Sequence, residues 1–334
     1  SVSIDLRNLR CKEAFEELTR NSDVLVDNWG SGAFRRLGLG YDHLSEINPG
    51  LVYASITGYG DSEGLTGPYS ARPANNLAIQ AMSGWMEITG DPDGPPQSVG
   101  DNIGDSIPGV WTALSIVLAL ETRRQTGKGQ YLDMAMYECM VAHIESNMNF
   151  FQATGSNPAR SRDRLATAGI TFKAKDGYVV LAGLRTEARM RDLWTLVGRE
   201  DLLEGDSRYL AGPGMDGLFY YEHVIPAIEV WSSELGKFEV AAKLTEIGFS
   251  MGVTQTMADL DVCPQLGARQ MFIETGDTLG GTFRGVKTPA RLTACIDSPM
   301  ETPPVLGEHN EEILCSLGGM TAEEVSALAA EGAL

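Results

Sequence analysis

The chain has 334 residues, 43% of them hydrophobic, and a net charge of −19. This length provides for two domains, each with its own core. The acidic excess argues against nonspecific nucleic-acid binding, which requires clustered cations. We therefore expect no nucleic-acid partner.

No uninterrupted apolar segment reaches the roughly 18 residues of a membrane span. The best candidate, residues 110–120, is interrupted by Thr112 and Ser115, so we expect no membrane partner. The cysteines are odd in number and widely spaced, without a CxxC pair, and the histidines form no HxxxH or HExxH pair. These patterns predict no metal site and favour a reducing, cytoplasmic location.

The first sixty residues alternate between strand-like and helical segments. Alternating apolar residues predict a strand over 1–6, and Asn8 predicts the cap of a helix that ends near Arg20. Short apolar strands are expected at 23–27 and 51–56, with helical segments between them. This rhythm is typical of parallel strands joined by crossover helices, and so of an α/β fold.

Two turns follow these strands, at 28–32 and 57–60. Ligands of open parallel sheets bind beyond the carboxyl ends of the strands, so both turns are candidates for a binding site. For Gly58 and Gly60 alone, a purely structural turn is the stronger interpretation.

The segment 100–138 holds the main candidate for chemistry. A loop ends at Gly104, and an apolar helix is expected from about 106 to 124, with a strand over 130–134 behind it. Asp105 would then precede the helix, where it meets free backbone N–H groups and the positive end of the helix dipole. One interpretation is an N-cap that contributes about 1 kcal/mol. The other is a nucleophilic carboxylate.

The rest of the chain is expected to contain helices, a hairpin and further strands. A helix is expected over 137–151, where Glu138 is a further carboxylate that could be buried and paired, and a hairpin over 170–182. A helical, smaller second domain is expected to follow, before strands return near 249–255 and 272–283 and two helices end the chain.

Several motifs together resemble the family III CoA-transferases, the family of formyl-CoA and carnitine CoA-transferases. They extend over nearly the whole chain: SDVLVDNWGSGAFRRLGLGYDHLSEINPGLVYASITGYG (22–60), NLAIQAMSG (76–84), TGKGQYLDMAMYE (126–138), KAKDGYVVLAG (173–183) and TPPVLGEHNEEIL (302–314). The resemblance implies an enzyme that moves CoA from an acyl-CoA to a carboxylic acid. The donor and acceptor are not readable from these motifs.

The resemblance also implies a fold. Residues 1–182 would form a Rossmann-like large domain, 183–280 a smaller α+β domain, and 281–334 a segment returning to the large domain. Two subunits would thread through each other as an interlocked homodimer. The family's first strand and helix would precede residue 1 and are expected to be missing from this sequence.

By the same resemblance, Asp105 is the catalytic nucleophile, because it lies four residues before Gly109 as in the family's aspartate turn. It would carry an aspartyl anhydride and then a thioester to CoA. Acyl-CoA is implied as substrate, with no tightly bound cofactor and no metal. The implied CoA-contacting residues are Asn28, Trp29, Arg35, Arg36, Arg72 and Met136.

Two alternatives remain. The same family contains α-methylacyl-CoA racemases, whose catalytic histidine would fall at Asn75 or Asn76, and neither amide can shuttle a proton. A non-catalytic acyl-CoA-binding protein is the other alternative, which the retained Asp105, Gly104 and Gly109 argue against.

Overall fold

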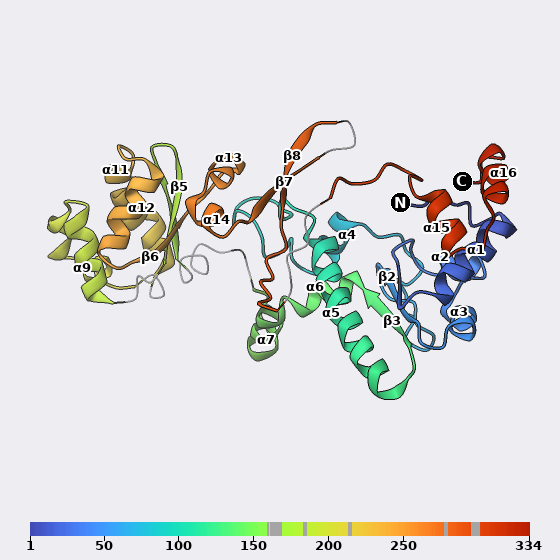
Figure 1. Cartoon of the computed structure of the whole chain (residues 1–334). Coiled ribbons are helices and arrows are strands. Elements are labelled where there is room, and N and C mark those ends of the chain that lie inside the picture. Colours follow the sequence, from blue (N-terminus) through green and yellow to red (C-terminus); the bar gives the residue numbers. More distant parts are fainter. Residues whose placement is uncertain (159, 161–168, 183–185, 213–215, 277–279, 295–300) are drawn as a thin grey trace.

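The computed structural model describes residues 1–158, 160, 169–182, 186–212, 216–276, 280–294 and 301–334. Figure 1 shows an elongated molecule in which one body contains β1–β3 and both chain ends, and another contains β4–β6. The hairpin of β7 and β8 lies between them.

A parallel sheet organises the first body. Its described strands β1 (Val24–Asp27), β2 (Val52–Thr57) and β3 (Gln130–Ala135) lie in the order β1-β2-β3. All pair in parallel, in a register that aligns Asp27 with Ser55 and Ser55 with Asp133. The predicted α/β class with a parallel sheet is confirmed.

Three helices contribute to a core with β2: α1 (Leu9–Arg20), α2 (Ala33–Arg36) and α3 (Tyr41–Ile47). Asn8 caps α1 as predicted, since its side chain accepts hydrogen bonds from the backbone N–H groups of Arg10 and Cys11. The buried residues of this core are Leu6, Phe34, Leu39, Leu44, Leu51 and Tyr53.

Helix α5 (Ile103–Thr126) connects β2 to β3, as a crossover helix does, and packs against both strands. It also packs against α4 (Asn76–Met82) and α6 (Met136–Ala142). The single helix expected over 137–151 is instead two, because the chain turns at His143 before α7 (Glu145–Thr154) begins.

Much of α5 is apolar and exposed. Only 22% of its most apolar 18-residue window is buried, and the helix is long and apolar enough, by length and composition, to cross a membrane. The expectation that no segment reaches this length is therefore wrong, because Thr112 and Ser115 are too few to make the helix polar. Its packing against the sheet is that of a core helix, whose remaining face is uncovered in a single chain.

The other body contains the antiparallel strands β4 (Ile170–Ala174), β5 (Gly177–Ala182) and β6 (Ser250–Val253), in that order. The predicted hairpin pairs with β6 and shares a hydrophobic core with the helices that follow it. The hairpin thus packs with the segment after it, whereas the family resemblance implied that it belongs to the large domain, 1–182. Residue 183, the implied start of the smaller domain, lies outside the described residues. The helices are α9 (Glu187–Leu196), α10 (Gly217–Phe219), α11 (Ile225–Ser232) and α12 (Lys237–Glu246), with 3₁₀ turns at Glu200–Leu203 and Ser207–Tyr209 and a π-helical turn at Tyr220–Val224.

Short elements follow β6. They are α13 (Met257–Asp261), α14 (Pro264–Ala268) and the antiparallel pair β7 (Phe272–Gly276) and β8 (Thr282–Val286). These strands confirm the expectation that strand structure returns after the helical region.

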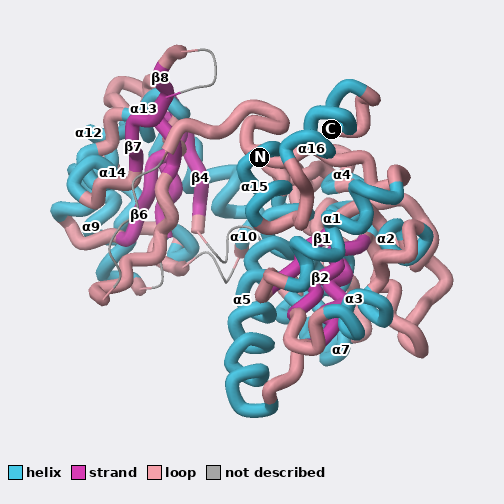
Figure 2. Tube along the Cα trace, turned by 45° about the vertical axis from the view of Figure 1, so that its right-hand side comes forward, coloured by secondary structure: helices cyan, strands magenta, loops and turns pink. Residues whose placement is uncertain are grey.

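The two ends of the chain lie together (Figure 2). The strand predicted over 1–6 is absent: this segment pairs with no strand and bonds to the C-terminal region, with Asp5 N–H donating to the carbonyl of Ala333. Helices α15 (Asn310–Ser316) and α16 (Ala322–Ala330) form a common core with α1, through Cys11, Ala14, Leu314, Met320, Val325 and Leu328.

Candidate active site

Polar side chains gather at the carboxyl ends of the parallel strands. Asp27, Ser55 and Asp133 are aligned across the sheet, so their side chains extend from the same face of it. Tyr53 and Tyr131, two residues earlier on their strands, are also aligned and lie on this face. Asp27 and Ser55 are only 6% and 5% exposed. The sheet therefore presents a polar row, buried at Asp27 and Ser55 and half-buried at Asp133, directly beyond an aromatic one.

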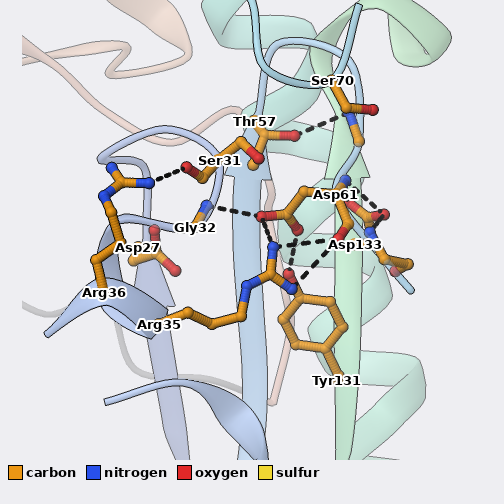
Figure 3. A network of polar contacts seen from close by, with 12 residues as sticks. Asp27, Ser31, Gly32, Arg35, Arg36, Thr57, Asp61, Ser70, Tyr131 and Asp133 are labelled. Atoms are coloured by element: carbon orange, nitrogen blue, oxygen red, sulfur yellow. Dashed lines mark hydrogen bonds and ion pairs between the residues drawn. The ribbon is translucent and has the colours of Figure 1, made fainter. Parts of the chain in front are cut away.

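Asp61, in the loop after β2, connects this row to the turn after β1 (Figure 3). Its carboxylate accepts hydrogen bonds from Gly32 N–H at 2.9 Å, from Arg35 Nη2 at 2.7 Å and from the Tyr131 hydroxyl at 2.7 Å. Its own backbone N–H donates to Asp133, 3.1 Å away. Both loops beyond the strand ends are thereby held to one another and to β3.

Burial raises the pKa of Tyr131, and its hydrogen bond to Asp61 raises it further. The pKa of Tyr53 is raised in the same way, first by burial and then by its hydrogen bond to Asp27. Both phenols therefore remain protonated at neutral pH and act as donors to the buried carboxylates.

Arg35 faces a pocket of about 290 Å³ that also contains Asp27, Asp61 and the three tyrosines 41, 53 and 131. Its guanidinium is held by Asp61, through both the carboxylate and the backbone carbonyl. Of the residues predicted to contact CoA, Arg35 alone lies in this first pocket.

The other five predicted contacts come together in a second, neighbouring pocket of about 260 Å³. Its walls are the turn after β1, the end of β2 and the loop before α4. Gly58 is required there, because a Cβ would lie 2.4 Å from the Cβ of Ala74. We call this the strand-end pocket; the predicted residues that line it are Asn28, Trp29, Arg36, Arg72 and Met136.

The strand-end pocket has two cations without a carboxylate partner. Arg36 Nη1 donates to the carbonyl of Ser31 at 3.0 Å, and the Arg72 guanidinium lies over the Tyr69 ring, 4.1 Å from its centre. Among the described residues, neither arginine forms an ion pair. Both charges are available to a phosphate-bearing ligand.

Asp105 is the third residue of α5 and not its N-cap, because the helix already begins at Ile103. Its side chain is exposed and, among the described residues, forms no hydrogen bond or ion pair. It does not line the strand-end pocket, but a short chain of contacts connects the two. Ala74 lines the pocket, Asn76 two residues later accepts a hydrogen bond from Gly104 N–H at 2.9 Å, and Asp105 follows Gly104.

Glu138 is exposed on α6 and, in the part of the chain that the structure describes, has no ion-pair partner. The expectation that it is buried and paired is wrong, since it occupies the outer face of its helix while Cys139 and Met140 face inward. At the position of the racemase histidine, Asn75 caps α4 by accepting from Ala78 N–H.

The described cysteines, Cys11, Cys139, Cys263 and Cys315, are all free thiols, and Cys295 lies outside the described residues. Burial raises the pKa of Cys139 to about 11, with Glu138 adding to the effect, so this thiol is unreactive at neutral pH. Within the described ranges, no group of three or more His, Cys, Asp or Glu residues could hold a metal ion.

Sequence reasoning missed the residues that support these loops. Asp133 had a detectable signal, since a carboxylate within an apolar strand requires a partner. Asp61 and Gln80 had no such signal in the sequence, because Asp61 lies in a glycine-rich loop and Gln80 in a short helix. Only the fold shows that both side chains are buried.

Comparison with known proteins identifies a family model and several relatives that match this chain. A family model described as "CoA-transferase family III" matches residues 1–310. The formyl-CoA:oxalate CoA-transferase of Streptomyces coelicolor is 31% identical over 100% of this chain and 83% of its own length. The succinyl-CoA:mesaconate CoA-transferase of Haloarcula hispanica is 32% identical over 95% of this chain and 79% of its own. A crystal structure of a CAIB/BAIF family protein from Brucella suis superposes with a TM-score of 0.85 at 31% identity, covering 95% of this chain and 81% of that one.

Proposed function

Because this chain belongs to CoA-transferase family III, we propose that Asp105 is the nucleophile with which it moves CoA from an acyl-CoA to a carboxylic acid. The observation that carries this proposal is the hydrogen bond from Gly104 to Asn76, which ties the first turn of α5 to a residue two positions after the pocket-lining Ala74. A thioester extending from that pocket would approach a carboxylate that has no hydrogen-bond or ion-pair partner among the described residues.

The first turn of α5 favours this role. Its backbone N–H groups and the positive end of the helix dipole favour an ionised carboxylate. Donors of the same kind stabilise the oxyanion that forms when a thioester carbonyl is attacked. Asp105 supplies the nucleophile, and the helix supplies charge stabilisation where it is needed.

The proposed reaction proceeds by four balanced displacements. An Asp105 oxygen attacks the thioester carbonyl, the C–S bond breaks, and CoA leaves as a thiolate from an aspartyl acyl anhydride. The thiolate attacks the aspartyl carbonyl and releases the donor acid, which leaves Asp105 as a thioester to CoA. The acceptor carboxylate attacks the aspartyl carbonyl of this thioester, the C–S bond breaks, and the CoA thiolate leaves from a second anhydride. The thiolate then attacks the acceptor acyl carbonyl, which forms the product thioester and releases the Asp105 carboxylate.

CoA is proposed to bind in the strand-end pocket. Arg36 and Arg72 would pair with its phosphates, Asn28 would supply an amide, and Trp29 and Met136 would contact its less polar parts. The guanidinium of the half-exposed Arg35 is already bound to the Asp61 carboxylate. Arg35 is therefore proposed to support the loops of this site through Asp61.

A homodimer is proposed from the exposed face of α5. Val110, Leu114, Val117 and Leu118 are 49–72% exposed and recur at helical spacing along one side. A second copy of this chain is the proposed cover, consistent with an interlocked dimer built on Rossmann-like large domains. A cytoplasmic location, inferred from cysteine usage, is likewise part of the proposal.

The racemase alternative finds no support at the position of the catalytic histidine. Both candidate asparagines there engage neighbouring backbone groups, Asn75 as the cap of α4 and Asn76 as an acceptor for Gly104. Neither is an acid or a base.

The test is intact mass spectrometry after incubation with acyl-CoAs, including formyl-, acetyl- and succinyl-CoA. The wild-type chain is expected to gain an acyl or CoA mass that hydroxylamine removes, and Asp105→Ala is expected to gain none. CoA binding by Asp105→Ala should persist. Adduct formation by this variant, or CoA binding by the wild type without an adduct from any donor, would overturn the assignment of Asp105.

A further inference from the structure

Gln80 in α4 is a fully buried amide that is hydrogen-bonded both to the segment leading to Asp105 and to Asn76. Its exposure is 0%. Its Oε1 accepts from Val99 N–H at 2.9 Å, and its Nε2 donates to the Asp101 carbonyl at 3.3 Å and to Asn76 Oδ1 at 2.9 Å. Because burying an amide is costly unless it is hydrogen-bonded, Gln80 specifies the path of residues 99–101.

Asn76 continues this arrangement to the start of α5. Its Oδ1 accepts from Gly104 N–H at 2.9 Å, and its Nδ2 donates to Asn102 Oδ1 at 3.2 Å. Asn102, the residue before α5, makes no capping bond with its own side chain. Asn76 therefore caps α5 from a neighbouring helix.

The fit at Gly104 leaves little freedom. A Cβ on Gly104 would lie 2.8 Å from the Asn76 carbonyl oxygen and 2.9 Å from its Oδ1. The backbone one residue before Asp105 is thus pressed against α4 as well as bonded to it.

We propose that Asn76 and Gln80 are positioning residues, which hold the first turn of α5 so that the Asp105 carboxylate meets the thioester carbonyl at the reactive distance and angle. This inference rests on the proposed function of Asp105. A weak nucleophile depends strongly on orientation, and a displacement of about 1 Å lowers the rate by about 100-fold.

The experiment measures two quantities separately: the single-turnover rate of adduct formation at saturating acyl-CoA, and the Kd for CoA by calorimetry. Asn76→Ala and Gln80→Met are expected to lower the rate by about 10- to 100-fold. Their Kd values should remain within about twofold of the wild type, because neither residue lines the strand-end pocket. A purely structural role predicts no such separation of rate from binding.

Asn75→Ala is the matched control. Asn75 caps the same helix and is the immediate neighbour of Asn76, but it bonds to Ala78 and not to residues 99–104. Its loss should lower the melting temperature and leave the rate unchanged. If Gln80→Met does not fold, the half-buried Asn76 still provides the test through Asn76→Ala.

The outcomes separate the two proposals. A wild-type enzyme that forms no adduct would refute the role of Asp105. A wild-type adduct that forms equally fast in Asn76→Ala, or one that slows equally in Asn75→Ala, would refute only the positioning role.

Discussion

Arg35 Nη2 lies 2.7 Å from the carboxylate of Asp61, whereas the next residue, Arg36, bonds to the carbonyl of Ser31. Two adjacent arginines on a four-residue helix thus face different pockets and have different partners. Arg35 holds two loops together, and Arg36 keeps its charge available.

This difference predicts distinct effects of removing each charge. Arg36→Gln is expected to raise the Kd for CoA about tenfold, a loss of about 1.4 kcal/mol, which is typical of one hydrogen bond to a charged group. Arg72→Gln should behave similarly, and the affinity of the wild type should fall with added salt.

Calorimetric titration with CoA provides the measurement. Arg124→Gln is the control, since this exposed arginine lies at the far end of α5 and, of the residues that the structure describes, forms an ion pair with Glu121 alone. If Arg124→Gln weakens CoA binding as much as Arg36→Gln, general charge and not the strand-end pocket governs affinity.

Asp61→Asn should destabilise the protein and weaken CoA binding together. The buried carboxylate loses its ion pair, and the turn at Gly32 loses a strong acceptor. Because Arg35 is half exposed, we expect a loss of about 2 kcal/mol in the free energy of unfolding, below the about 3–5 kcal/mol of a fully buried pair.

Denaturant unfolding with and without CoA measures both effects. Asp42→Asn is the matched control, because Asp42 lines the same first pocket but is exposed. A stable Asp61→Asn variant with normal CoA affinity would contradict the connecting role of this residue.

The exposed face of α5 predicts the oligomeric state. Size-exclusion chromatography with light scattering should give twice the chain mass of 36.0 kDa. Leu114→Lys and Val117→Glu should shift the protein toward a monomer or abolish soluble expression, since each places a charge in the proposed interface.

Leu9→Lys is the control for added charge, because Leu9 is 79% exposed on α1. A wild-type chain that elutes as a monomer would contradict the proposal that α5 forms a dimer interface. A Leu114→Lys chain that remains fully dimeric would also contradict it.

The buried Lys237 predicts a pH dependence in the other body. Its Nζ lies 2.5 Å from Asp259, and this hydrogen bond lowers the pKa of Asp259 to about 2. A lowered folded-state pKa gives stability that is present above the ordinary value of 3.8 and is lost as the pH falls toward 2.

The melting temperature of Asp259→Asn should therefore lie below that of the wild type at pH 7, and the difference should shrink between pH 4 and pH 2. Thermal unfolding monitored by circular dichroism gives both curves. A difference that stays constant across this range would show that the pair with Lys237 does not contribute through charge.

Local signals predicted much of the fold. The strands 23–27 and 51–56, the cap at Asn8 and the hairpin 170–182 depend on residues close in sequence, and each is present. Only the second of the two strands is buried as expected, since Val26 in β1 is 52% exposed. Five predicted CoA contacts share a pocket because parallel strands end at the same edge of the sheet.

What could not be predicted depends on contacts between distant segments. Alternation over 1–6 resembles a strand, but the segment finds its partners more than 300 residues away, at Asn310 and Ala333. The bond from Asn76 to Gly104 spans 28 residues and follows no period. Such contacts form only when helices distant in sequence pack together, so residue propensity and spacing do not predict them.

The shared core of α1, α15 and α16 has a consequence for synthesis. Cys11 and Ala14 are synthesised well before Leu314 and Leu328, the residues that cover them. The body that carries the parallel sheet is therefore completed only after α15 and α16 have been synthesised, while β4–β6 and their helices can fold earlier. In a nascent chain, the body with β4–β6 can therefore fold before the body that contains the N-terminal residues.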